Sequence, residues 1–378
     1  MSIIRSYISS SKKGGRFKLD KRKITDITAI ILFIACLIVP LLLFNTKENQ
    51  VSPIDNTMLP ELSEIGSSEN ITADIDEYIS SRIGLRTEAI TAYQYINDRL
   101  FNELMHPTYT YGTDGYVFFN MPDEKEDKKF LRTFVSYIAD MQNYCEKNDI
   151  EFLYCINPNK TQIYPDKLPK GANLTFFRQN YLLSQLDDNN INYIDNTIVL
   201  SNAAKAGVSV FNQKYDAGHW NETGAYIGIS NILSKLRETN PLIPVNSDED
   251  FTKSEIVNEF LPMSYFRINE TTTIYERKNS EVSDITSSDS DVQIDETYND
   301  FTHYVNPSHP EYPSILVFRG SYFLGKEKFM NESFSESVFV HSYHNIFNME
   351  YYIERYKPDI VLFESVEYAT IKKYFPFS

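Results

Sequence analysis

Cysteine and tryptophan are scarce in this sequence of 378 residues, with three cysteines and one tryptophan. None of the cysteines has the spacing of a zinc site. Cys36 falls in a long apolar run, whereas Cys145 and Cys155 lie in the later part of the chain. Those two could pair in an oxidising compartment, but we favour two buried thiols, one at a helix end and one on a strand.

Positive charge is also in short supply, because 36 Lys and Arg face 52 Asp and Glu and leave a net charge of −16. A protein with this balance is not attracted to anionic surfaces, which argues against a nucleic-acid partner. Residues 1–23 are the exception, since they hold eight Lys or Arg and only one acidic residue, Asp20. We interpret them as a basic cytoplasmic tail.

The apolar run "ITAIILFIACLIVPLLLF" follows directly, at residues 27–44. Eighteen residues of helix span roughly 27 Å, close to the hydrocarbon thickness of a bilayer. We therefore predict a transmembrane helix over residues 24–45, with the N-terminus in the cytoplasm. A cleaved signal peptide is the competing interpretation, but no small-x-small site follows the run. A buried core helix is disfavoured because the run has no polar face.

The rest of the chain is predicted to lie outside the cytoplasm. Residues 46–70 are polar, contain Pro53 and Pro60, and are typical of a linker. Residues 71–378 form the predicted extracytoplasmic domain. Within it, residues 246–308 are rich in Ser and Asp in part and low in apolar residues, so we expect an irregular, exposed excursion.

Strand and helix patterns alternate through most of this domain. The run "EFLYCIN" is a strand whose continuous apolar character suits a sheet covered on both faces. The segments "SILVF", "SVFVHSY" and "DIVLFESV" are further strands, separated by helical patterns. This order favours an α/β fold with a parallel sheet, in which ligands bind at the carboxyl ends of the strands.

Two polar motifs fall at such strand ends. Ser321 follows "SILVF" in "RGSYFLG", on an expected turn between a strand and a helix, where a hydroxyl is exposed and backbone N–H groups can stabilise an oxyanion. A serine needs a base held by a carboxylate, and Asp216 and His219 in "YDAGHWNETGA" offer that pair. Each motif alone has a structural explanation, because Asp is a common helix N-cap and Gly-Ser is common in sheet-to-helix turns.

Six segments, taken in order, resemble motifs of the alginate O-acetyltransferase group of SGNH-hydrolase-like proteins, which includes the DHHW proteins. They are "IDEYISSRIGLRTEAI" with Arg86, "YGTDGYVFF", "NPNKTQIYPDKLP" with Lys160, Tyr164 and Pro165, "DAGHWNETGA", "FRGSYF" and "KPDIVLFESVEY". Asp and His precede Ser here, as in this group, whereas ordinary SGNH hydrolases place Ser first. The chain departs from the group in its Asp-x-x-His spacing and in having Gly320 before the serine.

The resemblance implies a three-layer SGNH-hydrolase-like domain with a parallel sheet, and it implies roles for particular residues. Ser321 would be the nucleophile, His219 the base and Asp216 the orienting carboxylate. Substrate contacts are expected from Trp220, Tyr322, Asn159, Lys160 and Arg319, with Asn159 a candidate oxyanion donor and Lys160 either structural or facing an anionic glycan. No metal or cofactor is implied.

The implied activity is O-acyl transfer, in the first place of acetyl, onto a cell-surface or secreted polysaccharide. The acyl group would come from a membrane-bound O-acyltransferase partner, since acetyl-CoA is absent outside the cell. One alternative is a carbohydrate esterase with the same triad. Another is an inactive glycan-binding or scaffold member of a polysaccharide synthesis complex. The D-alanyl transfer protein of teichoic acid systems is disfavoured, because there the serine precedes the histidine.

Overall fold

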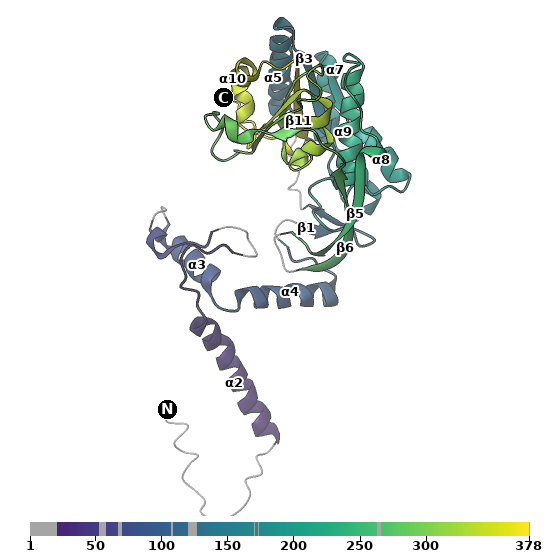
Figure 1. Cartoon of the computed structure of the whole chain (residues 1–378). Helices are drawn as coiled ribbons and strands as arrows, with labels where there is room; N and C mark the ends of the chain where they lie inside the picture. Colours follow the sequence, from purple (N-terminus) through teal and green to yellow (C-terminus); the bar gives the residue numbers. More distant parts are fainter. Residues whose placement is uncertain are drawn as a thin grey trace, which may run out of the picture. The chain divides into compact units, whose positions relative to one another are not determined.

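The structure is a computed structural model that describes residues 21–52, 58–66, 70–106, 109–119, 127–169, 171–172, 174–262 and 266–377. The chain divides into two compact units, Met1–Tyr93 and Gln94–Ser378 (Figure 1). This division falls later than the domain start expected at residue 71. The helix α4 (Arg86–Phe101) contains the boundary.

The N-terminal unit contains the apolar helix α2 (Lys21–Leu42). Residues 22–42 of this helix are long and apolar enough to cross a membrane, judged by length and composition. The helix begins three residues before the predicted span, because the basic residues Lys21, Arg22 and Lys23 are helical as well.

The helix α3 (Ile71–Arg82) follows the segment 46–70, which we expected to be a linker, and its last residue binds part of that segment. The buried Arg82 guanidinium donates to the carbonyl oxygens of Asn45, Lys47 and Pro60 at 3.1, 2.7 and 2.8 Å. These hydrogen bonds fix the backbone after α2, so the described part of residues 46–70 is more ordered than its composition indicates.

A seven-stranded sheet is the centre of the second unit, with the strand order β4-β3-β11-β9-β10-β8-β7. The first five strands of this order run parallel, whereas β8 runs antiparallel to both of its neighbours. The predicted α/β class is therefore confirmed, with a sheet that is mixed and mostly parallel. The strands are β3 (Glu151–Asn157), β4 (Tyr193–Asp195), β7 (Ser283–Asp284), β8 (Phe301–Val305), β9 (Ile315–Arg319), β10 (Glu336–His341) and β11 (Ile360–Val366).

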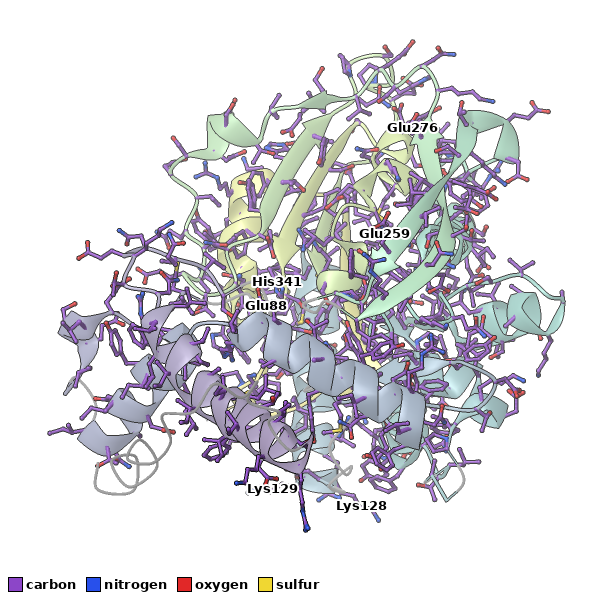
Figure 2. All side chains as sticks on the ribbon, turned by 90° about the horizontal axis from the view of Figure 1, so that it is seen from below. Glu88, Lys128, Lys129, Glu259, Glu276 and His341 are labelled. Atoms are coloured by element: carbon purple, nitrogen blue, oxygen red, sulfur yellow. The ribbon has the colours of Figure 1, made fainter. Side chains whose placement is uncertain are left out.

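Two antiparallel hairpins lie outside this sheet. The short hairpin joins β1 (Tyr109–Tyr111) to β2 (Val117–Phe119), with the sequence Thr-Asp-Gly at its turn. The long hairpin joins β5 (Phe251–Phe260) to β6 (Arg267–Arg277), and Glu259 and Glu276 mark its strands in Figure 2. We expected the segment 246–308 to be irregular, but it contains this long hairpin. Its polar strands were missed because much of the hairpin is solvent-exposed and carries little apolar alternation.

Helices cover both faces of the main sheet, which makes the three expected layers. Successive strand residues point to opposite faces. On one face Phe134 of α5 contacts the rings of Tyr154 and Phe363, with centroids 6.2 and 6.0 Å apart. On the other face the amide of Asn196, which precedes α8, lies 3.6 Å from the sulfur of Cys155. The helices of this unit are α5 (Lys128–Lys147), α6 (Lys160–Ile163), α7 (Phe177–Asp188), α8 (Thr197–Lys205), α9 (Glu222–Arg237) and α10 (Met349–Tyr356).

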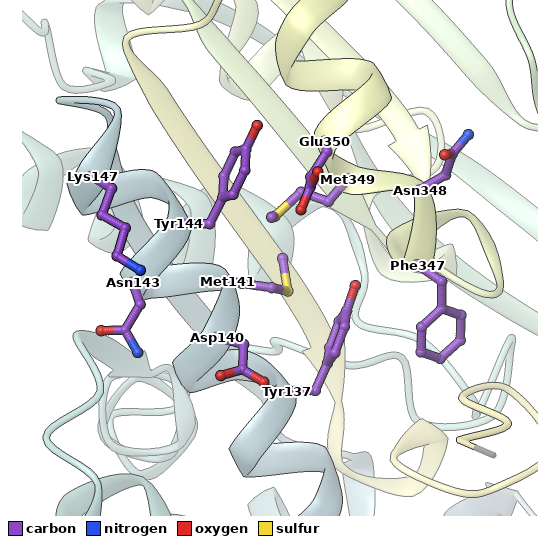
Figure 3. A pocket seen from close by; sticks show the side chains of 10 residues that line it. All are labelled: Tyr137, Asp140, Met141, Asn143, Tyr144, Lys147, Phe347, Asn348, Met349 and Glu350. Carbon is purple, nitrogen blue, oxygen red and sulfur yellow. The ribbon is translucent and has the colours of Figure 1, made fainter.

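A pocket of about 510 Å³ lies between α5 and the segment that leads into α10 (Figure 3). The aromatic rings of Tyr137, Tyr144 and Phe347 line it together with the carboxylates of Asp140 and Glu350. It contains none of the residues that the sequence singled out for chemistry.

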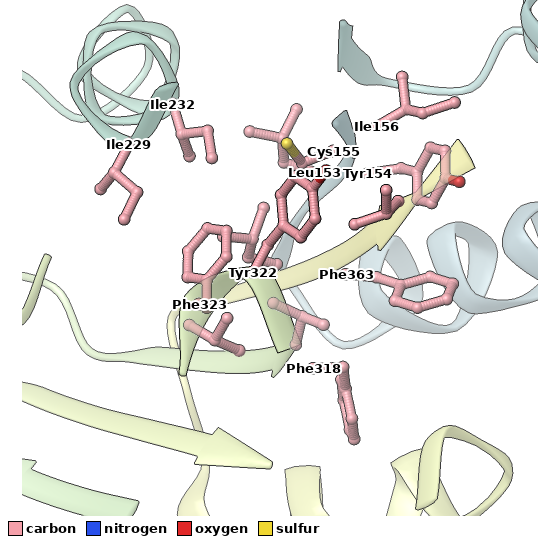
Figure 4. Close-up of a cluster of buried hydrophobic side chains, with 14 of the residues drawn as sticks. Leu153, Tyr154, Cys155, Ile156, Ile229, Ile232, Phe318, Tyr322, Phe323 and Phe363 are labelled. Carbon is pink, nitrogen blue, oxygen red and sulfur yellow. The ribbon is translucent and has the colours of Figure 1, made fainter. Parts of the chain in front are cut away.

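The core fills the space between the sheet and its helices, and Figure 4 shows side chains from both faces. Strands β9 and β11 are buried at every position, which explains their continuous apolar runs. Cys145 and Cys155 are both free and buried, as two thiols on a helix and a strand. Glu364 is a carboxylate in this fully buried part of β11, and it lies next to the candidate site.

Candidate active site

The nucleophile candidate Ser321 starts a short 3-10 turn, Ser321–Phe323, directly after β9. We expected an α-helix at this point, but three successive 3-10 turns occupy residues 321–333 instead. Gly325 interrupts them with a backbone φ of +69°, a left-handed conformation that suits glycine and ends helical geometry. The serine thus sits on a tight turn at the carboxyl end of a central strand.

Asp216 and His219 lie in the loop between α8 and α9, about a hundred residues before the serine. The loop brings the Asp216 Oδ1 to 2.7 Å from His219 Nδ1. His219 Nε2 in turn lies 3.0 Å from the Oγ of Ser321. A carboxylate that accepts from Nδ1–H leaves the lone pair of Nε2 facing the hydroxyl, which is the tautomer a general base needs.

A second contact joins the same two segments one residue further along. The Nε1 of Trp220 donates to the carbonyl oxygen of Tyr322 at 2.7 Å. Their rings also pack, with centroids 5.1 Å apart. Both side chains are almost completely buried. This contact fixes the spacing between the histidine loop and the serine turn independently of the His219–Ser321 hydrogen bond.

The five expected substrate contacts are all buried, with exposed fractions of 3% for Trp220, 1% for Tyr322, 7% for Asn159, 2% for Lys160 and 0% for Arg319. This differs from the expectation, because such side chains have almost no surface to offer a polysaccharide. Trp220 and Tyr322 instead hold the site together, and the Tyr322 hydroxyl donates to the carbonyl oxygen of Pro158 at 3.2 Å.

The other three side chains also face protein groups, although the buried guanidinium nitrogens of Arg319 have no hydrogen-bond partner in the described part of the chain. Asn159 caps α6 and donates its side-chain amide to Glu367 at 2.7 Å, so at least one of its two amide N–H groups is bound to a carboxylate. Lys160 donates to the carbonyl oxygens of Val117 and Gln213 at 2.7 and 2.8 Å. The guanidinium of Arg319 lies 3.9 Å from Asp300 and 3.8 Å from Glu327, within the protein interior.

Glu364 is a site residue that we did not predict. Its Oε2 accepts the N–H of Gly320 at 2.6 Å, and its Oε1 accepts from the amide of Asn157 at 2.8 Å. Burial raises the pKa of this carboxyl to about 7, against the lowering effect of those two donors. The Gly320 N–H is therefore directed at a carboxylate behind the nucleophile and not at the substrate side. A Glu inside the apolar run "DIVLFESV" was the available signal.

Glycine at position 320 allows this close approach. A Cβ there would lie 3.3 Å from the Glu364 Oε2, which is closer than about nine in ten real Cβ contacts. Asp or Thr, common before the serine in the resembling family, would need the carboxylate to move. The departure at Gly320 therefore accompanies the buried Glu364 in this chain.

Tyr368 is the second residue that sequence reasoning missed. It lies in the turn Glu367–Ala369 after β11, its hydroxyl interacts with the side chain of Ser321, and burial raises its pKa. Its ring stacks on Phe119 at a centroid distance of 6.1 Å. Tyr368 stays a neutral hydroxyl beside the nucleophile.

Among the residues that the structure describes, no group of three or more His, Cys, Asp or Glu could hold a metal ion.

The fold and the site together define an SGNH-type α/β protein with a Ser-His-Asp arrangement. Residues 110–296 match the family described as the SGNH hydrolase-like domain of acetyltransferase AlgX. The resemblance to alginate O-acetyltransferase-like and DHHW proteins is thereby confirmed. The matched range contains Asp216 and His219, and it ends before β9 and Ser321.

The chain is also similar to solved structures, and those with TM-scores above 0.5 share its fold. PatB1 from Bacillus cereus has a TM-score of 0.53 and 17% identity, over 68% of this chain and 95% of that chain. A DHHW family protein from Eubacterium siraeum has a TM-score of 0.51 and 14% identity, over 71% and 94%. The O-acetyltransferase domain of AlgJ from Pseudomonas putida has a TM-score of 0.48 and 16% identity, over 70% and 92%. No curated protein matches the chain.

Proposed function

We propose that this protein is a membrane-anchored O-acyltransferase that transfers acyl groups, in the first place acetyl, to the hydroxyls of an extracytoplasmic polysaccharide. The observation that carries the proposal is the pair of distances in the site, 2.7 Å from Asp216 to His219 and 3.0 Å from His219 to Ser321. These are the contacts through which a carboxylate orients a base and the base activates a serine. The family match to an acetyltransferase domain supports the choice of reaction.

The proposed reaction has two halves. In the first, His219 Nε2 takes the proton of Ser321, whose Oγ attacks the acyl carbon of the donor. The donor's leaving group departs with that proton, and an acyl-serine ester remains. In the second, His219 takes the proton of a sugar hydroxyl, the sugar oxygen attacks the ester, and Ser321 regains the proton as it leaves. Asp216 stabilises the imidazolium that forms in each half.

Anchoring and acyl supply complete the proposal. The helix α2, if retained, would hold the domain at the outer face of the cell membrane with the N-terminus in the cytoplasm. A multi-spanning membrane-bound O-acyltransferase is the proposed partner, because an acyl donor from the cytoplasm has to cross the membrane before Ser321 can receive it. The acceptor is proposed as a cell-surface or secreted polysaccharide.

The test is acyl-enzyme formation with p-nitrophenyl acetate, followed by intact-mass and peptide mass spectrometry of the full chain in detergent. We expect an acetyl adduct on Ser321, abolished in Ser321→Ala, and an acylation rate lowered by roughly 10²- to 10⁴-fold in His219→Ala. Ser314→Ala, at the other end of the same strand, is the matched control and should keep the wild-type rate. An adduct that persists in Ser321→Ala would contradict the proposal.

A carbohydrate esterase is the second candidate, and the openness of the site favours it. The side chains of Asp216 and His219 are 36% and 34% exposed, so water has access to the base. Adding oligosaccharides to the acetylated enzyme separates the two activities. Acetyl found on the sugar supports transfer, whereas free acetate at an unchanged rate supports hydrolysis.

A further inference from the structure

The carboxylate of Glu270 makes three hydrogen bonds to consecutive backbone N–H groups. Glu270 lies on β6 of the long hairpin, and it accepts from Gln213 at 2.5 Å, from Lys214 at 2.9 Å and from Tyr215 at 2.6 Å. The next residue in the chain is Asp216. The long hairpin, which holds none of the predicted site residues, thus binds the backbone that leads directly into the candidate triad.

The same backbone is also held by a buried lysine. Lys160 Nζ donates to the carbonyl oxygen of Gln213 at 2.8 Å, while Glu270 binds the N–H of that residue. Burial lowers the pKa of Lys160 to about 7, and the negative charges of Glu270 and Asp216 act to raise it. Glu270 therefore also supplies part of the negative charge that favours the protonated form of this lysine.

Asp216 needs such restraints because of its backbone conformation. Its φ is +45°, in the left-handed region, which residues other than glycine adopt only at a cost in conformational energy. Such a conformation persists only where the surroundings enforce it. Burial does not enforce it here, since the Asp216 side chain is 36% exposed. On the N-terminal side of Asp216, the Gln213 carbonyl also accepts from the Val117 N–H at 2.9 Å and its side chain donates to the Asp114 carbonyl at 2.8 Å. The acceptor described for the three N–H groups directly before Asp216 is Glu270.

We propose that Glu270 is a positioning residue that holds Asp216 in the conformation from which its carboxylate reaches His219. The catalytic part of this inference rests on the proposed acyl transfer, but the structural part concerns the Asp216–His219 hydrogen bond itself. The long hairpin then belongs to the active site as its support, although none of its side chains touches Ser321 among the contacts described.

The first test observes the Asp216–His219 hydrogen bond without any activity assay. The full chain in detergent is labelled with isotopic histidine, and the far-downfield proton signal of His219 Nδ1–H is recorded; Asp216→Asn identifies it by removing it. We expect the signal to weaken or vanish in Glu270→Gln and Glu270→Ala, because the remaining acceptors cannot satisfy all three N–H groups. Glu276→Gln, an exposed carboxylate of the same strand labelled in Figure 2, should keep the signal.

The second test compares acylation rates of the same variants with p-nitrophenyl acetate. Displacement of Asp216 should lower the rate constant roughly 10- to 100-fold in Glu270→Gln, with an unchanged concentration for half-maximal rate. A Glu270→Gln protein that keeps both the signal and the rate of Glu276→Gln overturns the inference. Loss of the signal in Glu276→Gln as well would overturn it too, because the effect would then belong to the hairpin in general.

These readouts separate the two proposals. If the wild-type chain forms no adduct on Ser321 but loses the His219 signal only when Glu270 is changed, the proposed function fails and the positioning role stands. If Glu270→Ala does not fold, the more conservative Glu270→Gln decides, with its thermal midpoint compared with that of Glu276→Gln.

Discussion

At the residue scale, the nucleophile turn depends on a carboxyl group buried behind it. Glu364 joins the Gly320 N–H on β9 to the amide of Asn157 on β3. Asn157 accepts from Asn196 at 2.7 Å, and Asn196 accepts from Asn231 of α9 at 2.9 Å. This chain of hydrogen bonds connects the helix that follows His219 with the turn that carries Ser321. We therefore expect a change in the charge of Glu364 to affect both the Ser321 turn and the helix α9.

We expect Glu364 to make the protein less stable as the pH rises. Burial raises the folded-state pKa of Glu364 from 4.5 to about 7, so its protonated form is favoured by folding. Its contribution to stability is fully present below about pH 4.5 and is lost as the pH rises through about 7. The difference amounts to at most about 3 kcal/mol in the free energy of unfolding.

Glu364→Gln, which cannot ionise, should remove this part of the pH dependence. Urea unfolding followed by circular dichroism across that pH range is the measurement. The exposed Glu350→Gln of α10 is the control and should retain the wild-type slope. An identical slope in Glu364→Gln and Glu350→Gln would show that Glu364 is not the group responsible.

At the element scale, the position of His219 depends on how closely α9 packs against the loop before it. A Cβ at Gly228 of α9 would lie 2.5 Å from the ring of Trp220, and one at Gly224 would lie 2.2 Å from the carbonyl oxygen of Val210. Only glycine permits these approaches. The indole of Trp220 is thereby pressed between α9 and the Tyr322 carbonyl that it binds, which places the neighbouring His219.

Gly228→Ala should therefore affect both stability and the site. The added methyl overpacks the interface, which costs about 1–3 kcal/mol of unfolding free energy. It also displaces the chain's only tryptophan, so its fluorescence spectrum should shift. Ser234→Ala, at an exposed position of the same helix, is the control and should leave both unchanged. A Gly228→Ala protein with wild-type emission and stability would refute the close packing of α9.

At the scale of the whole molecule, the N-terminal part of the chain differs from the rest in charge and hydropathy. Its net charge is −16, yet residues 1–23 are basic and are followed by the apolar α2. A cleaved signal sequence and a retained anchor share this pattern, and they differ in what remains attached to the mature protein.

We expect a retained anchor. Full-length protein made in a bacterial host should stay in the membrane fraction after an alkaline carbonate wash, and its intact mass should include residues 1–45. A chain that lacks residues 1–45 should appear in the soluble fraction. A mature protein that begins after α2 and needs no detergent would instead identify a cleaved signal sequence.

Much of the sheet could be predicted from the sequence, because its strands are buried on both faces. The runs that form β3, β9, β10 and β11 are continuously apolar, and amphipathic or apolar helical segments separate them. The long hairpin could not be predicted in the same way. Most side chains of β5 are exposed, so neither a continuous apolar run nor a clear alternation marks it.

The three central site residues could be proposed from the sequence because their types and strand-end positions suit one chemistry. Their supporting residues could not. Glu270 acts through hydrogen bonds to backbone that lies more than fifty residues earlier in the chain. The expected ligand contacts Lys160 and Arg319 are cations that the fold buries, and no local pattern reveals burial of that kind.

The strand order has a consequence for how this protein could be built. Asp216 and His219 precede the exposed residues 278–281, and Ser321 follows them. A break in the chain at that point would leave β3 on one fragment and β11 on the other, paired along seven residues at the centre of the sheet. Neither fragment would contain a complete site, so their reassociation would assemble the proposed Ser-His-Asp site. Residues 278–281 are therefore a suitable position to split the chain, so that recovery of activity would report the association of the two fragments.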